Sequence, residues 1–156
     1  DPKKLAYVTQ TTLSVDDAAK IVEALITKYP KIKLPAKEDI CYATQNRQDA
    51  VKSLAEHCDL IIVVGSANSS NSNRLREVAE TKGVRAFLID RAVDLKADWL
   101  SGVSKVGVTA GASAPEVLVC AVVDRLQTLG VDVVKEFSGI QEKVVFHVPG
   151  SLKRKT

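Results

Sequence analysis

The sequence predicts an α/β fold in which a parallel βαβ sheet carries helices on both faces, joined to parts of an adjacent α/β domain. One observation is the continuous apolar run at residues 60–64, which is typical of a strand buried on both faces. A second is the repeated order of an apolar run, a short polar loop and a segment of helical periodicity. Because each loop follows a strand and precedes a helix, the loops are expected to gather at one edge of the sheet.

The N-terminal part of the chain is expected to form a strand, a helix and a connector. Residues 5–8 form a short apolar run that suits a strand. Ser14 stands before two acidic residues, which indicates a helix N-cap and a first turn that complements the helix dipole. Apolar residues then recur at helical spacing, and Pro30 ends the helix. The basic stretch 31–37 contains a proline and is expected to be a connector.

The central part of the chain repeats a strand–helix pattern. Gly83 and Gly130 stand just after two of the expected helices, where a left-handed glycine commonly ends a helix. Ser113 opens a predicted capping box. Strands are predicted over 40–42, 60–64, 84–89 and 103–108. Helices are predicted over 47–57 with Asn46 as the cap, over 72–82, over 94–100 with Trp99 packed on the sheet, and from Ser113 to Gly130.

Two more strands are predicted near the C-terminus, at 131–137 and 143–148, with a turn at 138–141 between them. The pattern divides the chain into three parts. These are a partial α/β segment of an adjacent domain at 1–38, an α/β domain with the functional loops at 39–130, and strands with a tail that return to the adjacent domain at 131–156.

Composition narrows the class of protein. The 156 residues carry a net charge of only +3, and aromatic residues make up 4% of them, which leaves little for stacking on bases. The basic cluster 153–155 is expected to be a solvated tail, so we expect no nucleic-acid partner. No apolar run approaches the roughly 18 residues of a membrane span, so we expect no membrane partner either.

The three cysteines differ in their surroundings. An odd number in a chain with a large core argues against a disulfide framework and favours a reducing, cytoplasmic location. Cys58 and Cys120 are expected to be small core residues. Cys41 lies where an expected strand meets a polar loop, and could be a nucleophile, a metal ligand or uninvolved. The two histidines, His57 and His147, are expected to be core or surface residues and not its catalytic base.

Polar loops after the expected strands carry the functional signal. Six consecutive small polar residues run from Asn68 to Asn73, more than helix capping needs, and Arg74 adds a cation. The loop at 111–113 joins a glycine to a hydroxyl at a helix start. Such helix starts suit an anion, so a phosphate-bearing ligand beside Cys41 is predicted. The glycine patterns of P-loops and dinucleotide sites are absent from the sequence.

Taken together, four segments resemble the 4-hydroxy-3-methylbut-2-enyl diphosphate reductase family, which acts last in non-mevalonate isoprenoid synthesis. The resemblance covers essentially the whole chain and corresponds to the C-terminal half of the family's usual length. The segments that carry it are TQTTLS at 9–14, DICYAT at 39–44, GSANSSNSNRL at 65–75 and GVTAGASAP at 107–115.

The resemblance implies an oxidoreductase that removes a hydroxyl from an allylic diphosphate, giving isopentenyl and dimethylallyl diphosphates. It also implies a 4Fe-4S cluster on three cysteines, and Cys41 matches the third of them. Thr11 matches the threonine near the substrate hydroxyl, and Thr12 is a weaker candidate for the same substrate-binding role. The positions that match the family's diphosphate-binding residues are Ser69, Ser70, Asn71 and Ser113. An electron donor such as ferredoxin or flavodoxin is implied as a protein partner.

Several functional residues of the family have no matching position in this sequence. The family's two other cluster cysteines, its substrate-binding histidines and its proton-donating glutamate belong to an N-terminal part. The implied partner is therefore the N-terminal remainder of the same enzyme, and this chain alone is expected to lack an intact cluster and activity. The alternative is a non-catalytic phosphate- or nucleotide-binding α/β module, which would bind its ligand without iron.

Overall fold

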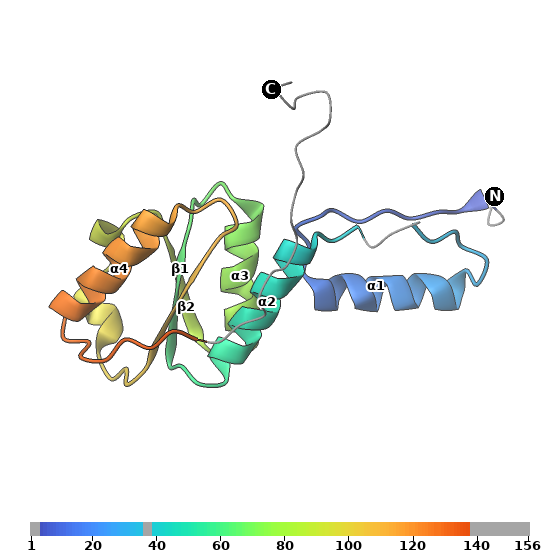
Figure 1. Ribbon diagram of the computed structural model, residues 1–156. Coiled ribbons are helices and arrows are strands. Elements are labelled where there is room, and N and C mark those ends of the chain that lie inside the picture. Colours follow the sequence, from blue (N-terminus) through green and yellow to red (C-terminus); the bar gives the residue numbers. More distant parts are fainter. Residues whose placement is uncertain (1–3, 36–38, 138–156) are drawn as a thin grey trace, which may run out of the picture.

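A three-stranded parallel sheet lies at the centre of the fold, between helices on both of its faces (Figure 1). In this computed structural model, which describes residues 4–35 and 39–137, the strands are β1 (Leu60–Val64), β2 (Arg85–Ile89) and β3 (Val106–Ala110). Their order is β2-β1-β3, with both neighbours parallel to β1. The predicted α/β class with helices on both faces is confirmed.

The central strand explains how the layers pack. All five residues of β1 are fully buried, and alternate side chains point to opposite faces. Ile61 and Val63 join one apolar cluster, which helices α2 (Tyr42–Ala55) and α3 (Ser70–Thr81) cover. Leu60, Ile62 and Val64 join a second cluster, which helix α4 (Glu116–Thr128) covers. The uninterrupted apolar run at 60–64 is therefore a consequence of burial on both faces.

The third helix begins two residues before the predicted start, because Ser69 and not a later residue is its N-cap. The Ser69 hydroxyl accepts a hydrogen bond from the Ser72 N–H at 3.3 Å. Past the C-terminal end of the helix, Gly83 adopts φ 81°, the left-handed conformation predicted there.

The predicted capping box before α4 does not form. The N-cap is Pro115, no side chain caps this helix end, and Ser113 lies in a preceding turn closed by the Ala114 N–H and the Gly111 carbonyl at 3.0 Å. A residue that precedes proline avoids the helical conformation, which keeps this turn outside the helix. The end of the helix agrees with prediction, since Gly130 has φ 102°.

The second helix corrects a wrong prediction. Residues 40–42 form no strand, and α2 starts at Tyr42 with Cys41 as N-cap, so Asn46 lies inside the helix. The buried face of α2 includes the polar residues Thr44 and Gln48 as well as apolar ones. The apolar residues alone therefore do not show how far the helix extends toward its N-terminus.

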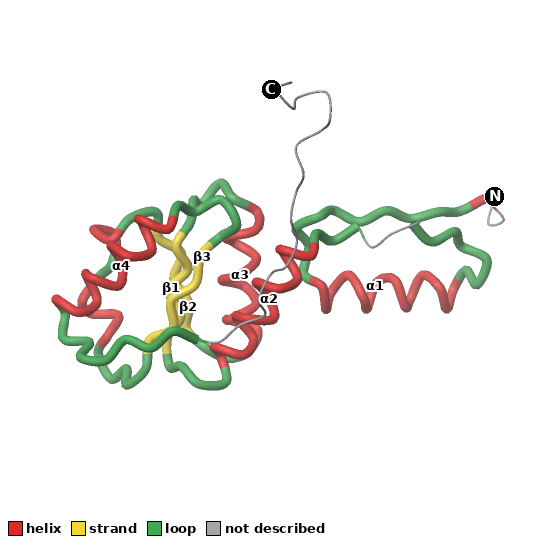
Figure 2. The backbone as a smooth tube through the Cα atoms, in the orientation of Figure 1, coloured by secondary structure: helices red, strands yellow, loops and turns green. Residues whose placement is uncertain are grey.

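The first helix, α1 (Val15–Lys28), and its flanking segments extend away from the sheet (Figures 1 and 2). Ser14 caps the helix as predicted, accepting from the Asp17 N–H at 3.2 Å. The strand predicted at 5–8 reduces to a single parallel bridge between Ala6 and Lys33. A lone bridge supplies too few ladder hydrogen bonds for a strand.

The segment between β2 and β3 forms two 3-10 turns, η2 (Ala92–Asp94) and η3 (Ala97–Leu100), in place of one helix at 94–100. The Trp99 ring stacks on Phe87 of β2 with centroids 3.9 Å apart, which confirms that it packs on the sheet. The strand predicted at 131–137 is wrong, because these residues have no regular structure and are mostly exposed.

The turn predicted at 138–141 and the strand at 143–148 lie outside the described residues. The three-part division of the chain stays a prediction. Within the described ranges, the structure contains no helix whose length and apolar character would allow it to cross a membrane.

Two cysteines differ in burial. Cys58 packs against the apolar cluster under α2 and α3, as predicted, and burial raises the pKa of its thiol. Cys120 is exposed, so its predicted core position is wrong. Because each helical residue advances by 100°, Cys120 points away from the side of α4 that buries Val122.

Candidate anion site at the sheet edge

The carboxyl ends of β1 and β3 lie side by side and lead into two of the predicted loops. Gly65 follows β1 and Gly111 follows β3, and the strands pair in register up to Val64 and Ala110. The Gly111 N–H donates to the Val64 carbonyl at 2.9 Å, which extends the ladder by one residue. The sheet therefore brings the loop before α3 next to the turn that contains Ser113.

The loop before α3 is held by its own side chains. Asn73 donates its amide N–H groups to the carbonyls of Ala67 at 2.7 Å and Ser69 at 3.0 Å. The Ser66 hydroxyl accepts from the Asn68 N–H at 3.2 Å. Several of the small polar residues thus shape the loop, while Ser70 stays exposed at the first turn of the helix.

Two buried polar side chains at this helix start are unpartnered. Asn71 is 8% exposed, and neither its amide nitrogen nor its amide oxygen has a hydrogen-bond partner among the described residues. The fully buried Ser72 hydroxyl also has none. Leaving a buried polar group unpaired costs about 1–3 kcal/mol, so such groups call for an explanation such as a ligand. At a helix N-terminus the matching ligand is an anion.

The glycines beside these side chains provide the required space. A Cβ at position 111 would overlap the Ser72 hydroxyl and lie 3.8 Å from the Asn71 amide nitrogen. A Cβ at position 65 would overlap the same hydroxyl. Both positions therefore need glycine because of close packing, not because of backbone conformation.

The threonine turn, residues 11–13 with the predicted Thr11 and Thr12, is fixed to α2 by one buried side chain. Gln48 is fully buried, accepts a hydrogen bond from the Val15 N–H at 3.0 Å, and donates to the Leu13 carbonyl at 2.8 Å. Lys52 adds an ion pair to Asp16 at 2.8 Å. This pairing holds the pKa of Asp16 below its usual value, chiefly through the Lys52 hydrogen bond.

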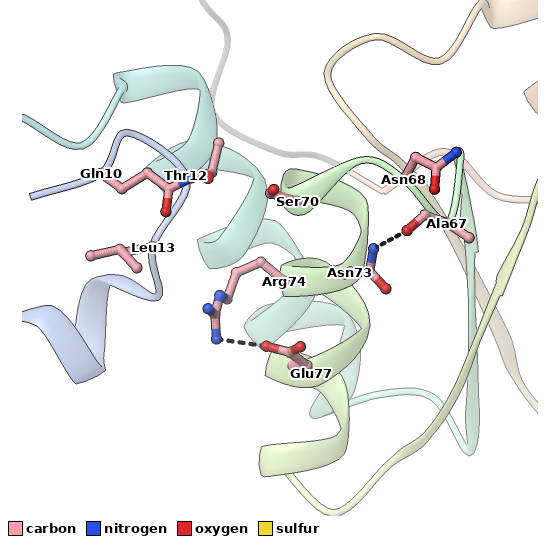
Figure 3. Close-up of a pocket in the computed structure, with 9 residues that line it drawn as sticks. All are labelled: Gln10, Thr12, Leu13, Ala67, Asn68, Ser70, Asn73, Arg74 and Glu77. Atoms are coloured by element: carbon pink, nitrogen blue, oxygen red, sulfur yellow. Dashed lines mark hydrogen bonds and ion pairs between the residues drawn. The ribbon is translucent and has the colours of Figure 1, made fainter.

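A polar cavity of about 340 Å³ separates the threonine turn from α3 (Figure 3). Thr12 lines it from the turn, and Ser70 lines it from the helix start. Arg74 also lines it, but its guanidinium already pairs with Glu77 at 2.6 Å. The remaining lining residues are Gln10, Leu13, Ala67, Asn68, Asn73 and Glu77 itself.

Cys41 lies next to the threonine turn. Its main-chain N–H donates to the Thr11 carbonyl at 3.3 Å, and the residue is exposed at the N-terminus of α2. Its thiol can therefore reach a group outside the described residues. Within those residues, no cluster of three or more histidine, cysteine, aspartate or glutamate side chains could hold a metal ion.

The structure thus arranges the predicted site residues in three local groups. Cys41 contacts Thr11, Thr12 shares a cavity with Ser70, and Asn71 packs beside Gly111. Ser69 is the helix cap between the latter two groups, and Ser113 is exposed in the turn after Gly111.

Sequence reasoning missed three residues that shape the site: Gln48, Ser72 and Gly65. A glutamine on the apolar stripe of a helix is a signal that could have drawn attention to Gln48. Ser72 gives no such signal, because a serine near a helix start is ordinary.

Comparisons with known proteins identify the family of the chain. A family model described as LytB protein matches residues 1–127. The chain is 59% identical over 152 residues to a 4-hydroxy-3-methylbut-2-enyl diphosphate reductase from Acinetobacter baylyi, covering 97% of this chain and 48% of the relative. It is 60% identical over 153 residues to the enzyme of the same name from Hahella chejuensis, again covering 48% of the relative.

Two solved structures are similar in fold. The E-1-hydroxy-2-methyl-but-2-enyl-4-diphosphate reductase of Plasmodium falciparum superposes with a TM-score of 0.76 at 44% identity, over 80% of this chain and 39% of that one. A second structure, described as an (E)-4-hydroxy-3-methyl-but-2-enyl diphosphate reductase and terminal enzyme of the non-mevalonate pathway, gives 0.55 at 34% identity, over 79% and 43%. The chain spans about half the length of the curated relatives it matches.

Proposed function

Because the chain belongs to the LytB protein family, we propose that it supplies part of the active site of a 4-hydroxy-3-methylbut-2-enyl diphosphate reductase. The reaction removes the allylic hydroxyl with two electrons and two protons, and releases water together with isopentenyl or dimethylallyl diphosphate. The remaining groups come from the part of the family's length that this chain does not match.

The observation that carries the proposal is the buried, unpartnered amide of Asn71. Substrate diphosphate at the start of α3 would give this amide a partner and would interact favourably with the helix N-terminus. Ser70 and Ser113 are exposed and would contribute hydroxyls, while Ser69 caps the helix and holds its first turn. Binding at the diphosphate, remote from the reacting carbon, orients the substrate.

Cys41 fits one ligand position of a 4Fe-4S cluster. It is exposed at the N-terminus of α2, so its sulfur is accessible to a group that lies outside the described residues. The other two cysteine ligands would come from the complementary, N-terminal part of the enzyme. When bound, the cluster supplies the electrons and the Lewis acidity that protein side chains lack.

The threonine turn would face the reacting end of the substrate. The Thr11 carbonyl accepts from the main-chain N–H of Cys41, which holds the two residues next to each other, and Thr11 is exposed. Its hydroxyl would therefore be available to the departing oxygen if Cys41 holds the cluster. Thr12 lines the cavity beside Ser70 and would contact the substrate between its two ends. A ferredoxin or flavodoxin would deliver the electrons, and the chain by itself would be inactive.

The direct test is complementation. This chain is co-expressed anaerobically with the N-terminal half of the Acinetobacter baylyi relative, and the purified complex is assayed for both products by mass spectrometry. We expect turnover and the visible and paramagnetic spectra of a four-iron cluster. Cys41→Ser should remove the cluster spectrum, whereas Cys120→Ser, at an exposed position on α4, should retain it. A normal cluster in Cys41→Ser would contradict the ligand assignment.

A binding measurement separates the alternative function. Isothermal titration of this chain with inorganic pyrophosphate should show binding that Asn71→Ala abolishes. Pyrophosphate binding without any cluster or turnover in the co-expressed complex would favour the non-catalytic phosphate-binding module.

A further inference from the structure

Ser72 occupies an unusual position for a polar residue. It is fully buried in the first turn of α3, and its hydroxyl has no partner among the described residues. The side chain lies between two glycines of separate loops, because a Cβ at either Gly65 or Gly111 would overlap its hydroxyl oxygen. The Ser72 side chain therefore occupies space that a side chain at position 65 or 111 would otherwise take.

The two glycines are fixed to the sheet. The Gly65 N–H donates to the Ile89 carbonyl and the Gly111 N–H donates to the Val64 carbonyl, both at 2.9 Å. The Gly111 carbonyl in turn accepts from the Ala114 N–H at 3.0 Å, which closes the turn that contains Ser113. A shift of Gly111 would therefore move Ser113 relative to the first turn of α3.

We propose that Ser72 is a positioning residue whose side-chain volume sets the spacing between the first turn of α3 and the turn after β3. A change in this spacing would move Ser113 relative to Asn71, and both residues are assigned above to the diphosphate. The inference rests on the proposed function for the identity of the anion. Its physical basis is that close-packed interiors transmit a displacement to neighbouring groups.

The packing predicts an asymmetry between the two glycines. A Cβ at position 111 would lie 3.4 Å from the Ser72 Cβ, which is an ordinary contact, so only the hydroxyl oxygen obstructs it. A Cβ at position 65 would lie 2.9 Å from the Ser72 Cβ, which is too close. Ser72→Ala should therefore relieve Gly111→Ala but not Gly65→Ala.

The test measures affinity for inorganic pyrophosphate by isothermal titration in the full 156-residue chain, under conditions where circular dichroism shows every variant folded. We expect Gly111→Ala and Gly65→Ala each to weaken binding by about tenfold or more. Adding Ser72→Ala should restore affinity to within about threefold of wild type for Gly111→Ala alone. Thr81→Ala, at the opposite end of α3, is the control and should bind as wild type does.

A second measurement keeps the inference separate from the proposed function. Amide resonances of Asn71 and Ser113 are recorded without ligand. Both should shift in Gly111→Ala and return in the double variant with Ser72→Ala. A wild-type chain without pyrophosphate affinity would contradict the proposed function, and the resonances would still decide the spacing role. Unchanged affinity in Gly111→Ala, equal rescue of both glycine variants, or resonances that do not return would overturn the inference.

Discussion

The main-chain N–H of Cys41 donates to the main-chain carbonyl of Thr11 across 3.3 Å. Two residues that are 30 positions apart in the sequence are therefore joined without using either side chain. The thiol of one and the hydroxyl of the other stay available for ligands, so each side chain can be changed while the contact that holds the two segments together is kept.

Thr11→Val should leave this contact intact and reduce turnover in the co-expressed complex. Valine has the shape of threonine without the hydroxyl, so a hydrogen bond to the substrate oxygen is lost while the cluster spectrum is retained. A bond worth about 1.5–3 kcal/mol corresponds to a loss of roughly tenfold to a hundredfold in kcat/KM. Thr11→Ser is the control and should keep most of the activity. Equal loss in both variants would contradict a role for the hydroxyl.

Asn71→Leu should stabilise the chain and abolish pyrophosphate binding. Leucine has a similar size and removes the buried amide that lacks a partner, so the free energy of unfolding should rise by about 1–2 kcal/mol. Urea unfolding measures the first effect and isothermal titration the second. Asn73→Leu is the matched control: its amide makes two hydrogen bonds, so this change should lower stability. A less stable Asn71→Leu would sink the ligand interpretation of the amide.

Gln48→Ala should loosen the link between α1 and the rest of the fold. The substitution leaves the Val15 N–H and the Leu13 carbonyl without their buried partner, which should cost about 2 kcal/mol. Urea unfolding measures the loss, and hydrogen exchange at Val15 should accelerate more than exchange in β1. Gln127→Ala, at an exposed position of α4, is the control and should change neither quantity. Uniform acceleration across both elements would indicate global destabilisation instead.

Asp59 should make stability depend on pH in the acid range. Its carboxylate accepts hydrogen bonds from the N–H groups of Lys105 and Ser104, both at 2.9 Å, and these hold its pKa below the ordinary 3.8. A lowered folded-state pKa contributes stability that is present above pH 3.8 and is lost as the pH falls through the folded value.

Asp59→Asn should therefore be less stable than wild type at pH 7, and the difference should shrink below pH 3.8, as measured by urea unfolding over a pH series. Asp59→Ser retains an acceptor without charge and is the control, so its difference from wild type should shrink over the same range. A difference that stays constant down to pH 2 would show that the carboxylate charge is not responsible.

The sequence predicts the elements whose patterns are local. The apolar run of β1, the helix ends at Gly83 and Gly130, and the Ser14 cap all depend on neighbouring residues, and all were confirmed. The predictions at 40–42 and 131–137 were wrong because apolar character alone cannot show whether a neighbouring strand is available to pair.

The local part of the candidate site could also be predicted, whereas its long-range contacts could not. The helix start with Ser69 and Asn71 follows from a run of small polar residues after a buried strand. The packing of Ser72 between Gly65 and Gly111 joins the connection from β1 into α3 to the turn after β3, and no local pattern records this contact. The same holds for Gln48, whose two partners lie 33 and 35 positions away.

In the loop between β1 and α3, the side chains of Asn73 and Ser66 form hydrogen bonds with main-chain groups of the same loop. Its shape is therefore encoded within a single short stretch of sequence. Such a stretch is suited to transplantation: grafted after the central strand of another parallel-sheet scaffold, together with a small residue opposite Ser72, it would test whether the helix start alone is enough to bind an oxyanion.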